Sequence, residues 1–473
     1  MAAGCVEPLG PGFFFLNRQA EIRPVADPAS GTGLHVRVVD HFENAGNRPL
    51  RSIEVRLPDG RAFGARDLRV TIDGRAVAPQ PASDTDRRLM RTPLNPIWKQ
   101  HQPREIVTEW DLMPEPTGRE TVAESAEAFY IADETALPLW QAPKGIFVRG
   151  GPNPMEATLT VVAPPDFRVL APGKPLKSGA LGDMAAHRFK IEPIEDFLPY
   201  VVAGRYLEQK TRTPQGEVNF WTLQPLDAQQ AQTAAERLAS SMRAYTDFFG
   251  PATKNETPVH VVEAPGDLPA EFGEAGNAGG GSFPSGALID RRALTQGVAN
   301  ESILELAEYE LARTWFGWRV RPRPEAQILM GRGAGLFGLI IAAEGRGPDE
   351  RRRMVALLLD RYDESRRIAT DRQLLEPPVG YSRAERISTG FRAALFFVAL
   401  EDLCGRDKLS AAFKQIVEAR GGGEVADEEL RAAAEDTSER DLAQMFRTWL
   451  NHPGIPDDFR VRYSSSPDTR SGN

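Results

Sequence analysis

The chain changes its pattern of apolar residues near residue 207. Before that point, short runs rich in β-branched and apolar residues, such as 34–44 and 52–58, are separated by glycine, proline and asparagine. Such runs are typical of strands joined by turns. The pattern predicts an N-terminal domain, residues 1–207, built as an antiparallel β sandwich or saddle. Its last run, which starts at Phe197, reads as one closing strand.

After about residue 225 the apolar residues take a helical spacing. The segment 226–250 has this spacing and ends at a glycine, as a helix would. A short strand at 258–265 and a glycine-rich stretch follow, and from Asn300 the chain is mostly helical. Asn300 is expected to cap a helix with one apolar stripe, which contains Leu304, Ala307, Leu311 and Trp315. The pattern predicts a second domain at 208–463, a disordered tail at 464–473 and an α+β fold class.

Composition is that of an ordinary globular protein. A chain of 473 residues with 41% hydrophobic and 26% charged residues is long enough for more than one domain. The net charge of −9 argues against a nucleic-acid partner. No apolar run approaches the roughly 18–20 residues of a membrane span. We therefore expect no integral membrane segment, and the longest run, 335–343, fits a buried helix. The oligomeric state stays open.

The two cysteines give little information on the compartment. Cys5 and Cys404 cannot form a disulfide framework, and Cys404 follows an apolar helical run that places it in the core. Cys5 ends the sequence M-A-A-G-C, which weakly resembles the end of a lipoprotein signal without its apolar segment. The compartment therefore stays open: we expect an exported or lipid-anchored protein if an upstream signal has been removed, and a cytoplasmic one otherwise.

The candidate chemistry lies in segment 306–318, LAEYELARTWFGW. Zinc peptidases use the pattern H-E-x-x-H because histidines four residues apart lie on one helix face and bind one ion. The glutamate between them is the general base for a zinc-bound water. Here Glu310 stands at the glutamate position, while Tyr309 and Arg313 stand at the two histidine positions. No pair among the six histidines has the H-x-x-x-H spacing.

The residues around Glu310 resemble the alanyl aminopeptidase family of gluzincins, whose helix runs H-E-L-A-H-x-W-F-G. The matching residues are Glu310, Leu311, Ala312, Trp315, Phe316 and Gly317. A C-terminal segment resembles the end of the family's catalytic domain, with matches at Ser438, Asp441, Leu442, Phe446, Trp449, Pro453, Gly454 and Pro456. The resemblance covers most of the chain. It implies a β-rich first domain and a thermolysin-like second domain.

The resemblance also assigns site positions, and most of them have changed. The third zinc ligand, a glutamate on the next helix, falls on Arg332. The loop G-A-M-E-N, which binds the substrate amine, falls on residues 273–277. In this degenerate loop Asn277 matches the motif, Glu274 stands at the alanine position and Gly276 replaces the anchoring glutamate. The transition-state tyrosine falls on Gly390. The family implies zinc, but its ligand positions here carry Tyr309, Arg313 and Arg332. We therefore expect no metal and no cofactor, with Glu310 as a vestigial base.

The charges give a reason for these replacements. A family zinc site sets a divalent cation against two glutamates, whereas here two arginines stand against Glu310. A buried, unpaired glutamate is costly, so pairing with Arg313 or Arg332 is one alternative. The other alternative is that both arginines point into solvent.

Three functions stay open at this point. The changed positions favour a catalytically inactive aminopeptidase-like protein that binds a peptide or a protein. An active zinc metallopeptidase with unconventional ligands is the second function. A non-metal hydrolase that reuses the cleft is the third, although no G-x-S-x-G motif is present. The sequence alone therefore leaves enzyme activity undecided, and leans against it.

Overall fold

A computed structural model describes residues 12–27, 31–46, 48–56, 65–82, 89–112, 122–124, 127–132, 139–141, 147–149, 155–191, 200–252, 258–265, 268, 279–284, 286–294, 296–376 and 381–463. The chain divides into two compact units, Met1–Tyr206 and Leu207–Asn473. This division lies next to the boundary expected at residue 207. The expected tail at 464–473 lies outside the described residues.

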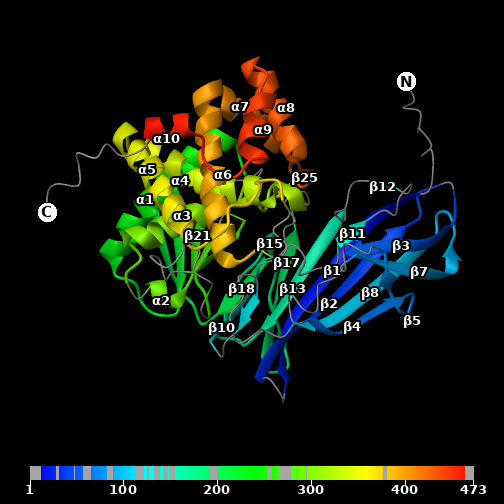
Figure 1. Ribbon diagram of the computed structural model, residues 1–473. Helices are drawn as coiled ribbons and strands as arrows, with labels where there is room; N and C mark the ends of the chain where they lie inside the picture. The colour runs from blue at the N-terminus through cyan, green and yellow to red at the C-terminus, as the bar shows by residue number, and fades with distance from the viewer. Residues whose placement is uncertain are drawn as a thin grey trace, which may run out of the picture. The chain divides into compact units, whose positions relative to one another are not determined.

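The first unit is built from strands (Figure 1). Their bounds are β1 (Gly12–Asp27), β2 (Gly31–Glu43), β3 (Leu50–Arg56), β4 (Ala65–Ile72), β5 (Arg75–Val77), β6 (Gln80–Pro81), β7 (Leu89–Trp98), β8 (Pro103–Leu112), β9 (Val122–Glu124), β10 (Ala128–Ala132), β11 (Leu139–Gln141), β12 (Phe147–Arg149), β13 (Glu156–Ala163), β14 (Arg168–Leu170), β15 (Lys174–Pro175), β16 (Gly179–Leu181), β17 (Met184–Ile191) and β18 (Tyr200–Gly204). In the described part of the chain, ten strands form one sheet with the main order β15-β17-β13-β1-β2-β8-β4-β5. Two four-stranded sheets have the orders β14-β18-β10-β9 and β11-β3-β7-β6.

Alternate burial explains why these segments are strands. In β8, Ile106, Thr108 and Trp110 are buried, while the residues between them are partly or fully exposed. Ile106 packs in an apolar core with Trp98, and Trp110 packs in another with Val36. A strand with this alternation is stable because one face leaves water while the other face stays hydrated.

Two expectations about this unit are wrong in detail. The sheet is not purely antiparallel, because β1 pairs in parallel with both β12 and β13. The run that starts at Phe197 is not one closing strand. Tyr200–Gly204 forms β18 and pairs with β10 and β14, whereas Leu207–Thr213 forms the first strand of the second unit. A continuous apolar run does not reveal where a chain passes from one sheet to another.

The second unit starts with a mixed sheet. Its strands are β19 (Leu207–Thr213), β20 (Gly216–Thr222), β21 (Val259–Glu263), β22 (Gly280–Phe283) and β23 (Gly286–Ile289). Within the described residues the order is β19-β20-β21-β23-β22. Strands β20, β21 and β23 run parallel, and β19 and β22 are antiparallel edge strands. A two-stranded pair, β24 (Arg321–Pro322) with β25 (Glu424–Val425), lies apart from this sheet.

Helices make up most of the rest of this unit (Figure 1). Their bounds are α1 (Ala228–Phe249), α2 (Arg291–Leu294), α3 (Glu301–Ala312), α4 (Ala334–Arg346), α5 (Pro348–Ser365), α6 (Arg383–Cys404), α7 (Arg406–Arg420), α8 (Asp427–Ser438), α9 (Ala443–Leu450) and α10 (Asp457–Tyr463). Helices α1 and α3 pack on the mixed sheet, and α4 packs on both of them. The chain is therefore a mixed α+β protein with a β-rich first part and a largely helical second part, which confirms the expected fold class.

Helix α4 is the buried helix that the apolar run 335–343 predicted. A 3-10 turn, Pro324–Ala326, and a π-helical turn, Gln327–Gly333, lead into it without a break. By length and composition the whole stretch Pro324–Arg346 could cross a membrane, but 89% of its most apolar window is buried inside the structure. Among the described residues this is the one helix of that kind, and its burial is that of a core helix. Cys404, expected in the core, is only half-buried at its edge.

Candidate functional site

The residues of the degenerate zinc motif lie at the end of α3. Asn300 caps the helix as expected, since its side chain accepts a bond from the backbone N–H of Ser302 at 3.0 Å. The helix ends at Ala312, and Arg313 is its C-terminal cap. Burial extends beyond the expected apolar stripe, because every residue from 303 to 312 is buried.

Tyr309, Arg313 and Arg332 meet around one aromatic ring. The Tyr309 side chain is 1% exposed, and the Arg313 Cζ lies 5.6 Å from its ring centroid. The spacing of four residues allows this contact, because it places both side chains on one helix face. Arg332 reaches the same ring from the π-helical turn, with its Cζ 5.9 Å from the centroid. The three positions that the resemblance assigned to zinc ligands therefore converge in space.

Glu310 is paired with Arg313. The Glu310 side chain is fully buried, and Arg313 Nη1 donates to Glu310 Oε2 at 2.8 Å. The other carboxylate oxygen faces the edge strand β22, where a Cβ built on Gly280 would lie 3.1 Å from Oε1. Arg313 itself is 26% exposed, so its guanidinium links the buried carboxylate to the surface. Of the alternatives left open by the sequence, the pairing of Glu310 with an arginine is the one present here.

Two glycines make room for the arginines. A Cβ at Gly390 on α6 would lie 2.5 Å from Cδ and 2.7 Å from Nε of Arg332. The Arg332 side chain therefore crosses α6 at a residue that has no side chain of its own. A Cβ at Gly335 would lie 2.9 Å from both Arg313 Cγ and Tyr309 Cε2. Real Cβ atoms do not approach heavy atoms so closely, because the overlap is strongly repulsive. Larger residues at either position would displace the arginines.

The residues that match the peptidase helix are packing residues. Trp315 is fully buried, and its Nε1 donates to the carbonyl oxygen of Gly250 at 2.7 Å. Phe316 stacks edge-on against Phe249 with centroids 5.7 Å apart. Gly317 lies against the backbone of Arg313, where a Cβ would be 2.8 Å from the carbonyl oxygen. The W-F-G residues that carry the resemblance are therefore residues that pack the core.

The C-terminal matches also pack in the core. Phe446 and Trp449 contact Phe396 with centroid separations of 5.2 and 6.2 Å. Gly454 donates its backbone N–H to Asp371, a buried carboxylate that also binds Arg392 at 3.0 Å. Burial lowers the pKa of Arg392, and Asp371 opposes this effect. Asp371 thus joins α6 to the segment that carries the matching glycine.

Sequence reasoning missed a second buried glutamate on α3. Glu308 is fully buried and accepts bonds from Arg237 at 2.9 and 2.8 Å, from Arg346 at 2.9 Å and from Ser241 at 2.7 Å. Burial lowers the pKa of Arg237, but the carboxylates of Glu308 and Glu301 together outweigh this effect and the pKa rises. These partners come from α1 and α4, so no local spacing in the sequence indicates the cluster.

Three residues expected in the degenerate substrate-binding loop lie outside the described residues, namely Glu274, Gly276 and Asn277. Their role stays a prediction from the resemblance.

Zinc, the metal that the resemblance implies, does not fit the side chains at positions 309, 313 and 332. Zinc binds lone pairs of thiolates, imidazoles and carboxylates. An arginine guanidinium stays protonated and has no lone pair to offer. Two guanidiniums beside Tyr309 also repel a divalent cation, and Glu310 is already bonded to Arg313. In the part of the chain that the structure describes, no three His, Cys, Asp or Glu side chains gather in a way that could hold a metal.

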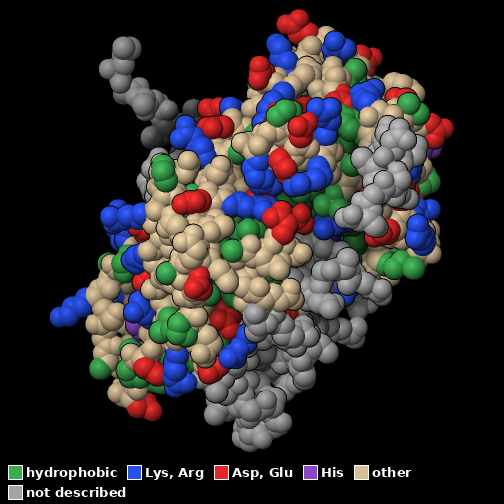
Figure 2. Space-filling view, turned by 90° about the vertical axis from the view of Figure 1, so that its left-hand side faces the viewer, with side chains coloured by type: hydrophobic (Ala, Val, Ile, Leu, Met, Phe, Trp, Pro, Cys, Tyr) green, Lys and Arg blue, Asp and Glu red, His purple; other side chains and the backbone are tan. Residues whose placement is uncertain are grey.

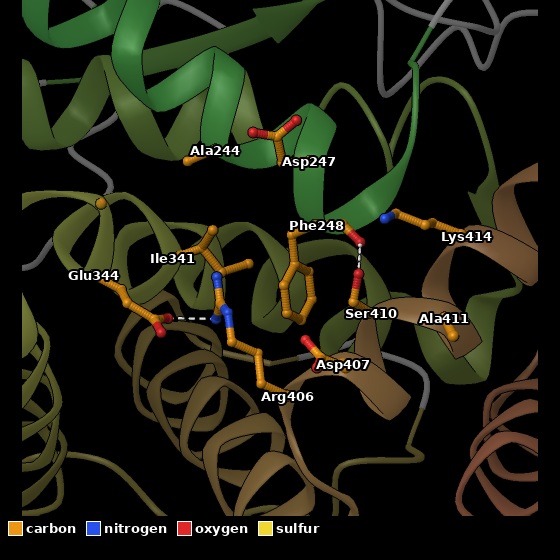
Figure 3. A pocket seen from close by; sticks show the side chains of 11 residues that line it. Ala244, Asp247, Phe248, Ile341, Glu344, Arg406, Asp407, Ser410, Ala411 and Lys414 are labelled. Atoms are coloured by element: carbon orange, nitrogen blue, oxygen red, sulfur yellow. Dashed lines mark hydrogen bonds and ion pairs between the residues drawn. The ribbon is translucent and has the colours of Figure 1, made fainter.

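A cavity of about 510 Å³ lies elsewhere in the second unit, between α1, α4 and α7 (Figure 3). It is lined by Ala244, Asp247, Phe248, Ile341, Glu344, Gly345, Arg406, Asp407, Ser410, Ala411 and Lys414. Arg406 stacks on the Phe248 ring, with Cζ 4.9 Å from the centroid, and pairs with Glu344. Burial raises the pKa of Glu344, and Arg406 counteracts the rise. Because none of the residues around Tyr309 lines this cavity, it belongs to a different place on the protein.

On the face seen in Figure 2, the Lys and Arg side chains of the described residues lie among Asp and Glu side chains. Pairs along α5 fit this picture, since Arg352 binds Asp349 at 3.0 Å with both side chains exposed. Exposed pairs of this kind contribute little to stability.

Comparisons with known proteins identify the fold. No protein-family profile matches the sequence, and no curated protein matches it significantly. The M1 zinc metallopeptidase from Deinococcus radiodurans aligns with a TM-score of 0.65 and 17% identity, over 94% of this chain and 95% of that chain. A mutant of that enzyme aligns with a TM-score of 0.65 and 16% identity, over 94% and 96%. The mutant bound to a Tyr-Ser-Ala substrate aligns with a TM-score of 0.64 and 16% identity, over 94% and 95%.

The chain has the fold of the M1 zinc metallopeptidases. The alignment includes both units, which confirms the resemblance to gluzincin aminopeptidases at the level of fold. At such low identity the M1 likeness shows the fold alone, and the chemistry has to be argued from the side chains.

The pairing of Glu310 predicts a loss of stability in the variant Glu310→Gln. The neutral amide cannot balance Arg313, and hydrogen bonds to a charged group in a partly buried site contribute roughly 1.5–3 kcal/mol. We expect a clearly lower midpoint of thermal unfolding, measured by circular dichroism. Asp349→Asn is the matched control, because Asp349 also pairs with an arginine three residues away but is exposed. An unchanged midpoint for Glu310→Gln would contradict a structural role for the pair.

Proposed function

We propose that this chain is a catalytically inactive aminopeptidase-like protein, which uses the M1 fold to bind peptides or proteins. The observation that carries the proposal is the 2.8 Å bond from Arg313 to Glu310 at the end of α3. A general base must accept a proton from water, and the guanidinium favours the charged, unprotonated carboxylate. The bond thus occupies one carboxylate oxygen of the residue that would have to act.

The surrounding positions support the same conclusion. Arg313 and Arg332 supply positive charge next to Glu310 but cannot bind or activate a water as a Lewis acid does. Gly390 has no side chain to donate a hydrogen bond to a developing oxyanion, and Arg332 fills the space beside it. At this one place, arginines occupy metal-ligand positions, the base is bonded to an arginine, and a glycine stands where an oxyanion donor would be needed.

Ligand binding is the part of the M1 enzymes' function that requires neither an activated water nor a general base. Solved M1 mutants hold a Tyr-Ser-Ala substrate, L-arginine or L-tryptophan. This chain shares their fold over 94% of its length. We propose that its ligand is likewise a peptide, presented either free or as a segment of a partner protein.

The proposal predicts that the purified full-length protein contains no stoichiometric zinc and does not cleave aminoacyl reporter substrates. Zinc would be measured by elemental analysis, and cleavage by release of the reporter with and without added zinc. The M1 enzyme from Deinococcus radiodurans serves as the positive control. One zinc per chain, together with chelator-sensitive cleavage, would refute the proposal and favour an active metallopeptidase with other ligands. Cleavage without zinc would favour a non-metal hydrolase.

A further inference from the structure

We infer that the cavity between α1, α4 and α7 binds a short peptide whose terminal ammonium and carboxylate groups are both free. The volume of this cavity, about 510 Å³, lies within the range of small-molecule sites in proteins. None of the residues around Tyr309 lines it. It is therefore a second site, separate from the degenerate zinc motif and independent of the proposed function.

Three of the five charged side chains that line the cavity are already paired. Arg406 pairs with Glu344, and its guanidinium also stacks on the Phe248 ring. Asp247 pairs with Arg243 at 3.2 Å, and both of these side chains are exposed. A ligand would have to displace these partners before it could use the three charges.

Asp407 and Lys414 are the two charged lining residues that are left. Both belong to α7, and within the described parts of the chain neither forms an ion pair. They are seven residues apart, almost two helical turns, so they lie on the same face of α7. Figure 3 shows Ser410 between them on that face. The cavity thus has a carboxylate at one end of this wall and an ammonium group at the other.

The separation of these two groups limits the length of the ligand. Seven residues of α-helix rise about 10.5 Å. Helical side chains lean towards the N-terminus, and lysine reaches farther than aspartate, so the charged groups of Asp407 and Lys414 lie closer together than their backbones. An extended peptide spans at most about 3.3–3.6 Å per residue. A peptide of two or three residues can therefore place its ammonium group at Asp407 and its carboxylate at Lys414.

The walls between the two charged groups are largely apolar. Phe248 and Ile341 line the cavity together with Ala244 and Ala411. The hydroxyl of Ser410 donates to the carbonyl oxygen of Phe248 at 2.7 Å, so this polar group is already satisfied. Apolar side chains of a peptide would remove these walls from water, which a small inorganic ion cannot do. Charge and apolar surface together favour a peptide with apolar side chains.

Three dipeptides test the inference by titration calorimetry with the full-length protein. They are Leu-Leu with both termini free, N-acetyl-Leu-Leu, which lacks the ammonium group, and Leu-Leu amide, which lacks the carboxylate. We expect each blocked peptide to bind about 5- to 10-fold more weakly than the free dipeptide. This range lies between the contributions of exposed ion pairs and of hydrogen bonds to charged groups.

Two variants assign each terminus to its partner. In Lys414→Met, the free dipeptide and Leu-Leu amide should bind equally well, while N-acetyl-Leu-Leu should still bind more weakly. In Asp407→Asn, the free dipeptide and N-acetyl-Leu-Leu should bind equally well, while the amide should still bind more weakly. Lys408→Met is the matched control, because Lys408 is an exposed lysine of the same helix that does not line the cavity. It should leave all three affinities unchanged.

Both tested side chains are exposed, so the variants are expected to fold, and circular dichroism checks this. No detectable binding of free Leu-Leu, or equal affinities of the wild type for all three dipeptides, would overturn the inference. The same preference for free termini in folded Lys414→Met and Asp407→Asn variants would place the dipeptide elsewhere on the protein. That result would also overturn the site in this cavity, but it would leave the proposed function standing.

Discussion

Replacing Tyr309 and Arg313 with His, and Arg332 with Glu, should give a protein that binds one zinc ion per chain. The structure brings the three side chains to one place, since Arg313 and Arg332 both contact the Tyr309 ring. Two imidazoles, one carboxylate and a water satisfy the tetrahedral preference of zinc. The variant also removes the guanidinium that holds Glu310, so the carboxylate becomes available to a metal-bound water.

The expected gain in stability is large. A metal that binds only the folded state stabilises it by about 4 kcal/mol when its free concentration is a thousand times the dissociation constant. Adding zinc should therefore raise the midpoint of thermal unfolding of the triple variant by several degrees, and a chelator should reverse the rise. Zinc content by elemental analysis measures the stoichiometry.

The same variant should still be a poor aminopeptidase. Gly390 cannot donate to the oxyanion of the transition state, and loss of one such donor typically costs about 100-fold or more in rate. Tyr309→Phe with Arg313→Gln and Arg332→Gln is the matched control, because it removes the same charges without adding ligands. A triple variant that folds but has no affinity for zinc would show that the three backbone positions do not have the geometry of a metal site.

Replacing Glu308 with Gln should destabilise the second unit more than any other single change discussed here. Glu308 is fully buried and binds Arg237 and Arg346, whose side chains are only 14% and 27% exposed. Removing one partner of a buried ion pair typically costs 3–5 kcal/mol, roughly, because the remaining charge stays buried without compensation. For a unit of this size the loss corresponds to a midpoint lower by about 10 °C.

The control for Glu308→Gln removes the other carboxylate that binds the Arg237 guanidinium. Arg237 also pairs with Glu301, which is 61% exposed. Glu301→Gln should lower the stability by no more than about 1 kcal/mol, since water replaces an exposed partner at little cost. Scanning calorimetry would compare both variants with the wild type, and equal midpoints for the two would contradict the role assigned to burial.

The sequence determined those features that depend on neighbours along the chain. Asn300 as a helix cap, the helix that ends at Gly250 and the buried run 335–343 all follow from the spacing of apolar residues and from capping chemistry over a few residues. The W-F-G motif indicated the fold because Trp315 and Phe316 are packing residues whose shapes the core requires. The motif also identified Glu310 as the residue to examine.

Only the tertiary structure decided which charges meet. Glu308 lies 71 residues from Arg237 and 38 from Arg346. The parallel pairing of β1 with β13 joins segments that are even farther apart along the chain. The sequence left the arginines beside Glu310 either paired or in solvent. Their placement depends on a π-helical turn and on the space left by Gly390 and Gly335. The pattern of apolar residues determines which side chains are buried, because the tendency of a side chain to leave water depends on its own chemistry. A salt bridge requires two charges to lie within a few ångströms of each other, and only the folded backbone fixes that distance.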